Sequence, residues 1–196
     1  MSTPLRLIVG LGNPGEQYAR TRHNAGVWFV ARFAEQLGAQ FKNEKKFFGQ
    51  VATVNYLQHE IRLLIPNTYM NESGKAVGAI AHFYKLKSED ILVAHDELDL
   101  PAGSIRFKQG GGLAGHNGLR DITRALGGSQ SFNRLRIGVG HPGTKSDVIG
   151  HVLSSVSPTD EKLILRCIDE ALALMPQAVE GEWEQAMNAL NGFSAS

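Results

Sequence analysis

Polar residues suited to acid–base chemistry follow several of the strands predicted for this chain. His23 follows a strand expected at residues 5–9, and His95 and Asp96 follow one expected at residues 91–94. A histidine and a carboxylate from two strand ends can form a general base for water, because the carboxylate fixes the imidazole tautomer and stabilises the imidazolium. Asparagine amides can stabilise the charge that develops on a carbonyl oxygen. The other polar residues of these loops are Asn13, Tyr18, Asn24, Asn67, Thr68, Tyr69, Asn71, His116 and Asn117.

Residue types alone do not select the base. His23, His95, His116 and His141 all lie in loops or at strand ends, where water has access. Each of these polar residues, taken singly, is also common as a turn former or a helix cap. The choice among the four histidines therefore stays open at this point.

Other chemistries fit the sequence less well. Gly10-x-Gly12-x-x-Gly15 matches a dinucleotide-binding fingerprint, but no helix opens at the third glycine and the next strands form a hairpin. No Gly-x-Ser-x-Gly elbow is present, and Cys167 lies on the apolar stripe of a predicted helix, which favours a buried, unreactive thiol. No His-Glu-x-x-His pair occurs, and the carboxylates near Asp96 offer only half of a metal site. We therefore expect no metal and no cofactor.

Strands and helices alternate along the chain, which predicts an α/β domain with a mixed sheet over residues 1–196. Two adjacent strands, at 47–57 and 61–65, are close enough for an antiparallel hairpin. The remaining strands are expected at 5–9, 91–94, 105–108 and 135–139. Helices are expected at 24–37 with Asn24 as N-cap, at 72–84, at 119–126, at 157–175 with Ser157 as N-cap, and around 183–190.

The composition is that of a globular protein, with 42% hydrophobic and 20% charged residues. A single cysteine excludes an intramolecular disulfide and fits a reducing compartment. The apolar run after Arg6 is too short for a signal peptide, and no stretch approaches the roughly 20 apolar residues of a membrane span. We expect a cytoplasmic protein without membrane contact.

Charge is distributed unevenly along the chain, although the net charge is only +1. Residues 101–146 carry seven lysines and arginines against one acidic residue, Asp121, whereas residues 147–196 carry two against eight. The basic segment indicates a polyanionic partner, while solvated faces of helices and strands would give the same pattern. A non-catalytic RNA-binding module therefore remains an alternative to an enzyme.

Five motifs occur in order along the chain. The amino-terminal one is Gly10-Leu11-Gly12-Asn13-Pro14-Gly15 with Tyr18 and Thr21-Arg22-His23-Asn24-Ala25-Gly26. The other four are PNTYMNESG at 66–74, HDELDLP at 95–101, GLAGHNGLR at 112–120 and FNRLRIGVGHP at 132–142. Together and in this order they resemble the motifs of the bacterial peptidyl-tRNA hydrolase family, and the resemblance extends from Leu5 to about the end of the chain.

This resemblance implies a monomeric enzyme with a twisted mixed sheet flanked by helices, which hydrolyses the ester between a peptide and the 3′ ribose of tRNA. It implies that His23 is the general base, that Asp96 supports it, and that Asn13 distinguishes blocked from free aminoacyl groups. It further implies that Lys108 and Arg136 hold the 5′ phosphate of the tRNA. The residues implied to contact the substrate or line its cleft are Tyr18, Tyr69, Met70, Asn71, Gly115, His116 and Asn117.

Overall fold

The computed structural model describes residues 4–196 and contains one seven-stranded mixed sheet. The spatial order is β2-β3-β4-β1-β5-β7-β6, in which β4, β1, β5 and β7 run parallel, and β2, β3 and β6 pair antiparallel with their neighbours. The domain predicted for residues 1–196 includes three residues, 1–3, outside the described range. The strands are β1 (Leu7–Gly10), β2 (Lys42–Glu44), β3 (Gly49–Tyr56), β4 (His59–Pro66), β5 (Ile91–Glu97), β6 (Ile105–Gln109) and β7 (Asn133–Gly138).

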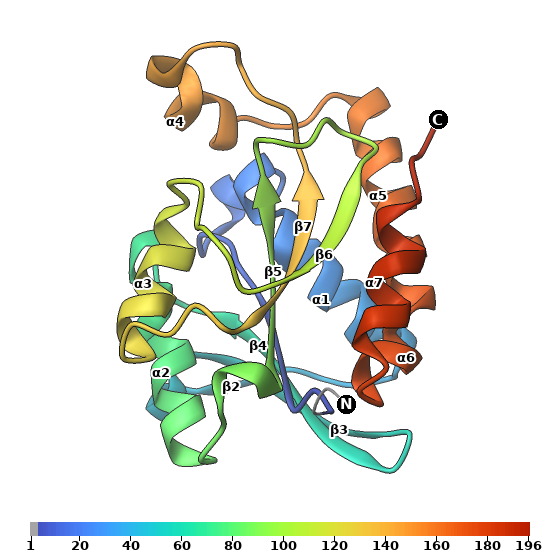
Figure 1. Cartoon of the computed structure of the whole chain (residues 1–196). Coiled ribbons are helices and arrows are strands. Elements are labelled where there is room, and N and C mark those ends of the chain that lie inside the picture. The colour runs from blue at the N-terminus through green and yellow to red at the C-terminus, as the bar shows by residue number, and fades with distance from the viewer. Residues whose placement is uncertain (1–3) are drawn as a thin grey trace.

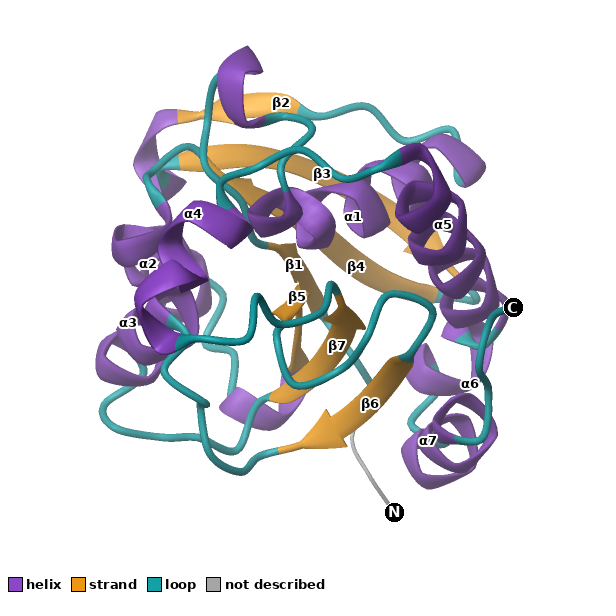
Figure 2. Cartoon of the chain, turned by 90° about the horizontal axis from the view of Figure 1, so that it is seen from above, coloured by secondary structure: helices purple, strands orange, loops and turns teal. Residues whose placement is uncertain are grey.

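Helices cover both faces of the twisted sheet, as the view from above shows (Figure 2). On one face lie α2 (Ser73–Phe83) and α3 (Asn117–Ala125), and on the other lie α1 (Ala25–Gln36), α5 (Pro158–Ala173), α6 (Met175–Val179) and α7 (Trp183–Asn191). The short helix α4 (Val148–Val152) stands apart at one end of the sheet (Figure 1). The predicted α/β fold with a twisted mixed sheet flanked by helices is confirmed.

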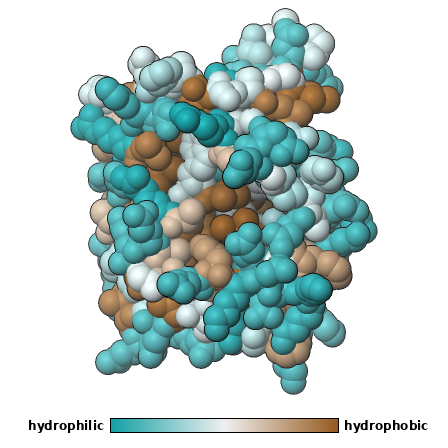
Figure 3. Space-filling view, turned by 180° about the vertical axis from the view of Figure 1, so that it is seen from behind, coloured by the Kyte–Doolittle hydropathy of each residue, from teal (hydrophilic) through white to brown (hydrophobic). Residues whose placement is uncertain are grey.

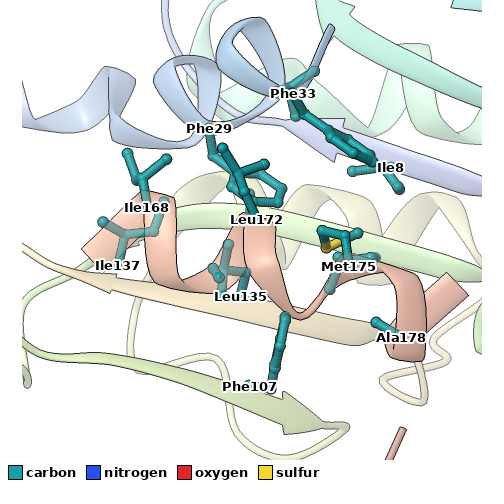
Figure 4. Close-up of a cluster of buried hydrophobic side chains, with 14 of the residues drawn as sticks. Ile8, Phe29, Phe33, Phe107, Leu135, Ile137, Ile168, Leu172, Met175 and Ala178 are labelled. Atoms are coloured by element: carbon teal, nitrogen blue, oxygen red, sulfur yellow. The ribbon is translucent and has the colours of Figure 1, made fainter. Parts of the chain in front are cut away.

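Two apolar cores fix these layers. The larger core packs α1, α5 and α6 on the sheet, and it contains Phe29, Phe33, Leu135, Leu172 and Met175 (Figure 4). The smaller core packs α2 and α3 against the opposite face through Leu7, Val9, Val77, Ile80 and Ile122. The central strand β1 sends alternate side chains into the two cores, which is why residues 7–9 read as a continuous apolar run.

The structure corrects several predicted elements. The strand expected at 91–94 continues to Glu97, so His95 and Asp96 are buried strand residues rather than loop residues. The helix predicted over 157–175 ends at Ala173, and Pro176 lies in the separate helix α6. Asn24 precedes α1 without capping it through its side chain. The short elements β2 and α4 were not predicted, because three and five residues give too little periodicity.

The structure also tests the predictions for the single cysteine and for membrane-spanning helices. Cys167 is 1% exposed in the larger core, which confirms the predicted burial, and this burial raises the pKa of its thiol to about 11. None of the helices within residues 4–196 combines the length and the apolar character needed to span a lipid bilayer.

Gly26 allows α1 to approach the sheet closely. A Cβ at this position would lie 2.2 Å from the carbonyl oxygen of Ala94 in β5. We expect Gly26→Ala to destabilise the protein by about 1–3 kcal/mol and to lower its activity, because overpacking would move His23 away from Asp96. Urea unfolding measures the first effect. Gly192→Ala is the control, since its Cβ would have only ordinary contacts at 3.8 and 3.9 Å, and an equal loss there would contradict the explanation.

Candidate active site

A cleft of about 520 Å³ opens where the parallel strands β1, β4, β5 and β7 end. Ligand sites of open α/β sheets occur at this edge, because the loops from the carboxyl ends of the strands converge there. The sequence-predicted residues that line the cleft are Asn13, His23, Tyr69, Met70, Asn71, Asp96, Gly115, His116 and Asn117. The structure thus brings together residues from four separate sequence blocks.

His23 and Asp96 are in direct contact. His23 lies in the short 3₁₀ helix η2 (Arg22–Asn24) immediately before α1, and its Nδ1 is 2.9 Å from Asp96 Oδ2. His116 contacts the same carboxylate, with its Nε2 2.9 Å from Asp96 Oδ1, which also lies 3.0 Å from His23 Nδ1. The Asp96 side chain is 1% exposed, whereas the two imidazoles are 13% and 10% exposed. A buried carboxylate therefore lies between two imidazoles at the floor of the cleft.

The charge of Asp96 is maintained against its burial. Burial by itself raises the pKa of this carboxyl group, but His116 and His23 together lower it by more, through their charge and their hydrogen bonds. The net result is a pKa well below the ordinary range of an aspartic acid. Asp96 is consequently a carboxylate at neutral pH, and it can accept the Nδ1–H of His23 and leave His23 Nε2 without a proton.

His95 is placed differently from its neighbour. Its ring is 1% exposed, and its Nδ1 lies 2.9 Å from the carbonyl oxygen of Asp96. Burial, followed by the nearby His116, lowers the pKa of His95 well below its ordinary value. A buried imidazole that does not line the cleft cannot reach a substrate, so the structure removes His95 from the candidate bases.

Asn13 presents one defined end of its amide to the cleft. Its Oδ1 accepts a hydrogen bond from the backbone N–H of Met70 at 2.7 Å. Its own backbone N–H and C=O are both bound by the side chain of Asn24, at 2.9 and 3.0 Å. Asn24, which the sequence places at the start of a helix, therefore stabilises the loop of Asn13. Because the amide oxygen is occupied, the Nδ2 group of Asn13 is the end available to a ligand.

Two helix N-termini position the other asparagines. Asn71 lies in η4 (Met70–Glu72), directly before α2, and Asn117 is the first residue of α3. The backbone N–H of Gly74 donates to Asp121 Oδ2 at 2.7 Å, which ties the start of α2 to α3. Gly118 lets the start of α3 pack closely against Met70 in η4, because a Cβ on Gly118 would lie 2.6 Å from Met70 Sδ.

Helix α4 supplies a wall that sequence analysis missed. Ile149 and Leu153, which are 72% and 40% exposed, line the cleft with Val148 and Val152. Seen from behind, hydrophobic side chains gather near the upper edge of the molecule, on the side of α4 (Figure 3). The apolar residues 148, 149, 152 and 153 have helical spacing, but the segment is too short for this spacing to predict a helix by itself. The cleft also contains Glu97, Leu98, Asp99, Ala114, His141 and Lys145.

Three predicted binding residues do not line this cleft. The Tyr18 ring packs edge-on against Tyr69, with ring centroids 6.3 Å apart, so Tyr18 lies beside the cleft. Lys108 and Arg136 lie on β6 and β7, where Arg106 is opposite Arg136 and Lys108 is opposite Arg134. Residues directly opposite in an antiparallel pair share one face of the sheet, so these four basic residues lie on one face. The guanidinium of Arg106, however, donates to the carbonyl oxygens of Ile105 and Phe193. Arg136 also contacts Glu97, at 2.8 Å.

The same three side chains, His23, Asp96 and His116, have the composition of a metal site. Their candidate ligand atoms all lie within 4.8 Å of one another. Those atoms, however, already contact each other at hydrogen-bonding distances. A metal ion would have to replace both hydrogen bonds, so the arrangement fits a hydrogen-bonded triad directly and a metal centre only after it rearranges.

A histidine bonded to a buried carboxylate, in a cleft at the carboxyl edge of an α/β sheet, is an arrangement suited to a hydrolase. A family model described as peptidyl-tRNA hydrolase matches residues 7–196. The chain is 54% identical to a peptidyl-tRNA hydrolase of Alcanivorax borkumensis, over the whole of both proteins, and 54% identical to one of Edwardsiella ictaluri, over 98% of each. This chain belongs to the peptidyl-tRNA hydrolase family.

Solved structures agree with this assignment. A crystal structure of peptidyl-tRNA hydrolase from Acinetobacter baumannii superposes with a TM-score of 0.96 at 48% identity, and covers 100% of this chain and 99% of that one. A complex of a peptidyl-tRNA hydrolase with N-propanol gives a TM-score of 0.95 at 49% identity, over 98% and 97% of the two chains.

Proposed function

We propose that this chain hydrolyses the ester bond between the peptide and the 3′ ribose of peptidyl-tRNA, with His23 as the general base that activates water. Family membership supports the reaction. The observation that carries the choice of base is the contact between His23 Nδ1 and the buried carboxylate of Asp96. It leaves His23 Nε2 as the ring nitrogen able to take a proton inside the cleft.

The proposed steps need no covalent intermediate. Water gives a proton to His23 Nε2 as its oxygen bonds to the ester carbonyl carbon, and the carbonyl oxygen becomes an oxyanion. Collapse of this intermediate breaks the bond to the ribose 3′ oxygen, and His23 returns its proton to that oxygen. A ribose hydroxyl leaves far more easily than an amine, so activated water suffices.

Asparagine amides are suited to stabilise the oxyanion. The Nδ2 group of Asn13 is a donor whose orientation is fixed, because its Oδ1 is held by the Met70 N–H. Preorganised donors of this kind stabilise developing charge without reorganising during the reaction. Asn71 and Asn117 line the same cleft and are proposed to hold the substrate on either side.

The apolar wall and the cationic face suggest how the two parts of the substrate bind. Ile149 and Leu153 offer an apolar surface to the peptide. Like charges directly opposite in a sheet are destabilising, so a phosphate between Lys108 and Arg136 would relieve the repulsion among Lys108, Arg134 and Arg136 on β6 and β7. Contacts to the phosphate backbone carry no sequence information, which suits an enzyme that accepts many tRNAs.

We expect Lys108→Ala combined with Arg136→Ala to raise KM at low salt and leave kcat close to that of the wild type, the pattern of lost uniform binding. The slope of log affinity against log salt should flatten by about 0.7–0.9 for each lost phosphate contact. Arg6→Ala is the control, because Arg6 is exposed before the amino end of β1, away from the cleft. An equal effect on a minimal substrate without the tRNA body would show that the two residues are structural.

The non-catalytic RNA-binding module explains the cationic face but not the buried His23–Asp96 contact. Single-turnover release of peptide from a model peptidyl-tRNA separates the two functions. Release faster than spontaneous hydrolysis supports the enzyme, while tight binding without release supports the module.

We propose that the reaction uses no metal ion. Enzyme treated with a chelator and dialysed should retain the activity of the untreated enzyme to within about twofold, because protein groups supply both the base and the charge stabilisation. Loss of activity that returns on addition of one divalent metal would contradict this and assign His23, Asp96 and His116 as ligands. We further propose that the protein acts as a cytoplasmic monomer formed by one domain over residues 1–196.

A further inference from the structure

We infer that His116 is a positioning residue that caps helix α3 with one ring nitrogen and holds the carboxylate of Asp96 with the other. The inference extends the proposed function, and its kinetic test rests on that function. In this arrangement His116 has a single tautomer, and it fixes the carboxylate that in turn fixes the base. The substrate is not its direct partner.

The cap determines the tautomer. His116 is the N-cap residue of α3, and its Nδ1 lies 3.1 Å from the backbone N of Gly118 and 3.3 Å from that of Leu119. Backbone N–H groups only donate, so Nδ1 must accept and cannot carry a hydrogen. A neutral imidazole has one N–H, which is therefore at Nε2.

The hydrogen at Nε2 points to the carboxylate. His116 Nε2 lies 2.9 Å from Asp96 Oδ1, while Asp96 Oδ2 lies 2.9 Å from Nδ1 of His23. His23 Nδ1 also lies 3.0 Å from Oδ1, so His23 faces both oxygens while His116 holds Oδ1, and rotation of the carboxylate would break these contacts. Through Asp96, the N-terminus of α3 thus sets the orientation of the His23 ring, although His116 and His23 are not hydrogen-bonded to each other.

The other groups around the ring are compatible with this assignment. From β5, His95 packs against His116 with ring centroids 5.1 Å apart, and its Nδ1 donates to the backbone of Asp96. The ring centroid of His23, in η2, lies 5.3 Å from that of His116. Asp96 is the carboxylate bonded to the ring. Both nitrogens of His116 are engaged, so His116 has no free lone pair for water and is not a second base.

Two substitutions separate the cap from the carboxylate contact. Asparagine is a good N-cap, so His116→Asn keeps an acceptor for α3 but loses the donor to Asp96, whereas His116→Ala loses both. We expect the melting temperature to fall by about 2–4 °C in His116→Ala and to remain near the wild-type value in His116→Asn. We expect kcat to fall about tenfold in both variants with KM unchanged, the effect of a lost hydrogen bond to a charged group.

A double-mutant cycle tests the route through Asp96. In an Asp96→Asn background, His116→Asn should lower kcat by less than twofold, because the carboxylate on which it acts is gone. Nitrogen-15 NMR of the wild-type protein should show the neutral His116 ring protonated at Nε2. His59→Asn, in the distant β3–β4 hairpin, is the matched control and should alter none of these quantities.

The outcomes that overturn the inference are distinct. A ring protonated at Nδ1, or equal melting temperatures in His116→Ala and the wild type, would remove the cap. A wild-type kcat in His116→Asn, or a tenfold loss that persists in the Asp96→Asn background, would remove the action through Asp96. If the protein did not hydrolyse peptidyl-tRNA at all, the proposed function would fail, yet the NMR and melting experiments would still decide the cap and the tautomer.

Discussion

Replacement of His23 by alanine should lower turnover of peptidyl-tRNA by about 10²–10⁴-fold and leave the fold intact, because general-base catalysis contributes a factor of this size. The triad contains two imidazoles. His23 contacts Asp96 through Nδ1, which leaves its Nε2 for water, whereas His116 uses Nε2 for Asp96 and Nδ1 for the N-terminus of α3. Its side chain does not belong to either apolar core, so its loss opens no cavity there, and His116 still donates to the buried Asp96 carboxylate. Steady-state hydrolysis and thermal melting measure the two effects.

The control for this experiment is His82→Ala, an exposed histidine in the last turn of α2, which should leave turnover unchanged. Near-normal turnover in His23→Ala would show that another group is the base. His141 would then be tested next, because it lines the cleft, whereas both nitrogens of His116 are engaged.

Replacement of Asp96 by asparagine should lower kcat by about 10²–10⁴-fold, comparable to the loss of the base itself. An amide offers one oxygen and one NH₂, while the carboxylate accepts hydrogen bonds from two imidazoles. One imidazole would then face the NH₂ group. If this is His23, its Nδ1 must become the acceptor and its hydrogen must move to Nε2, the atom that has to receive the proton from water.

Nitrogen-15 NMR of Asp96→Asn provides a direct test, with the hydrogen of His23 expected at Nε2 rather than Nδ1. Asp160→Asn, in the first turn of α5, makes the same change of charge away from the cleft and should keep the wild-type kcat. A role of Asp96 in packing alone predicts a different result: reduced melting temperature with unchanged kcat.

Local patterns in the chain were enough to establish the class of the fold and the order of its major elements. Apolar residues spaced for a helix at Phe29, Val30 and Phe33 form the buried face of α1, and the run at 91–94 forms the first part of β5. Such patterns are readable in advance, since each element must bury one face wherever it ends up in the fold. The ordered motifs, through their resemblance to a family, also indicated His23 and Asp96 together.

The geometry of the site depends on contacts that exist only in the folded chain. His23 and Asp96 are 73 positions apart, and their contact depends on the close passage of Gly26 against β5. The role of Asn24 as a support for Asn13, the cationic face of β6 and β7, and the wall formed by α4 likewise depend on contacts between distant segments. The four candidate histidines are equivalent in the sequence, and the proposal of His23 as the base rests on what the ring nitrogens contact. Those contacts form only when the sheet is assembled and the ends of its parallel strands meet at one edge.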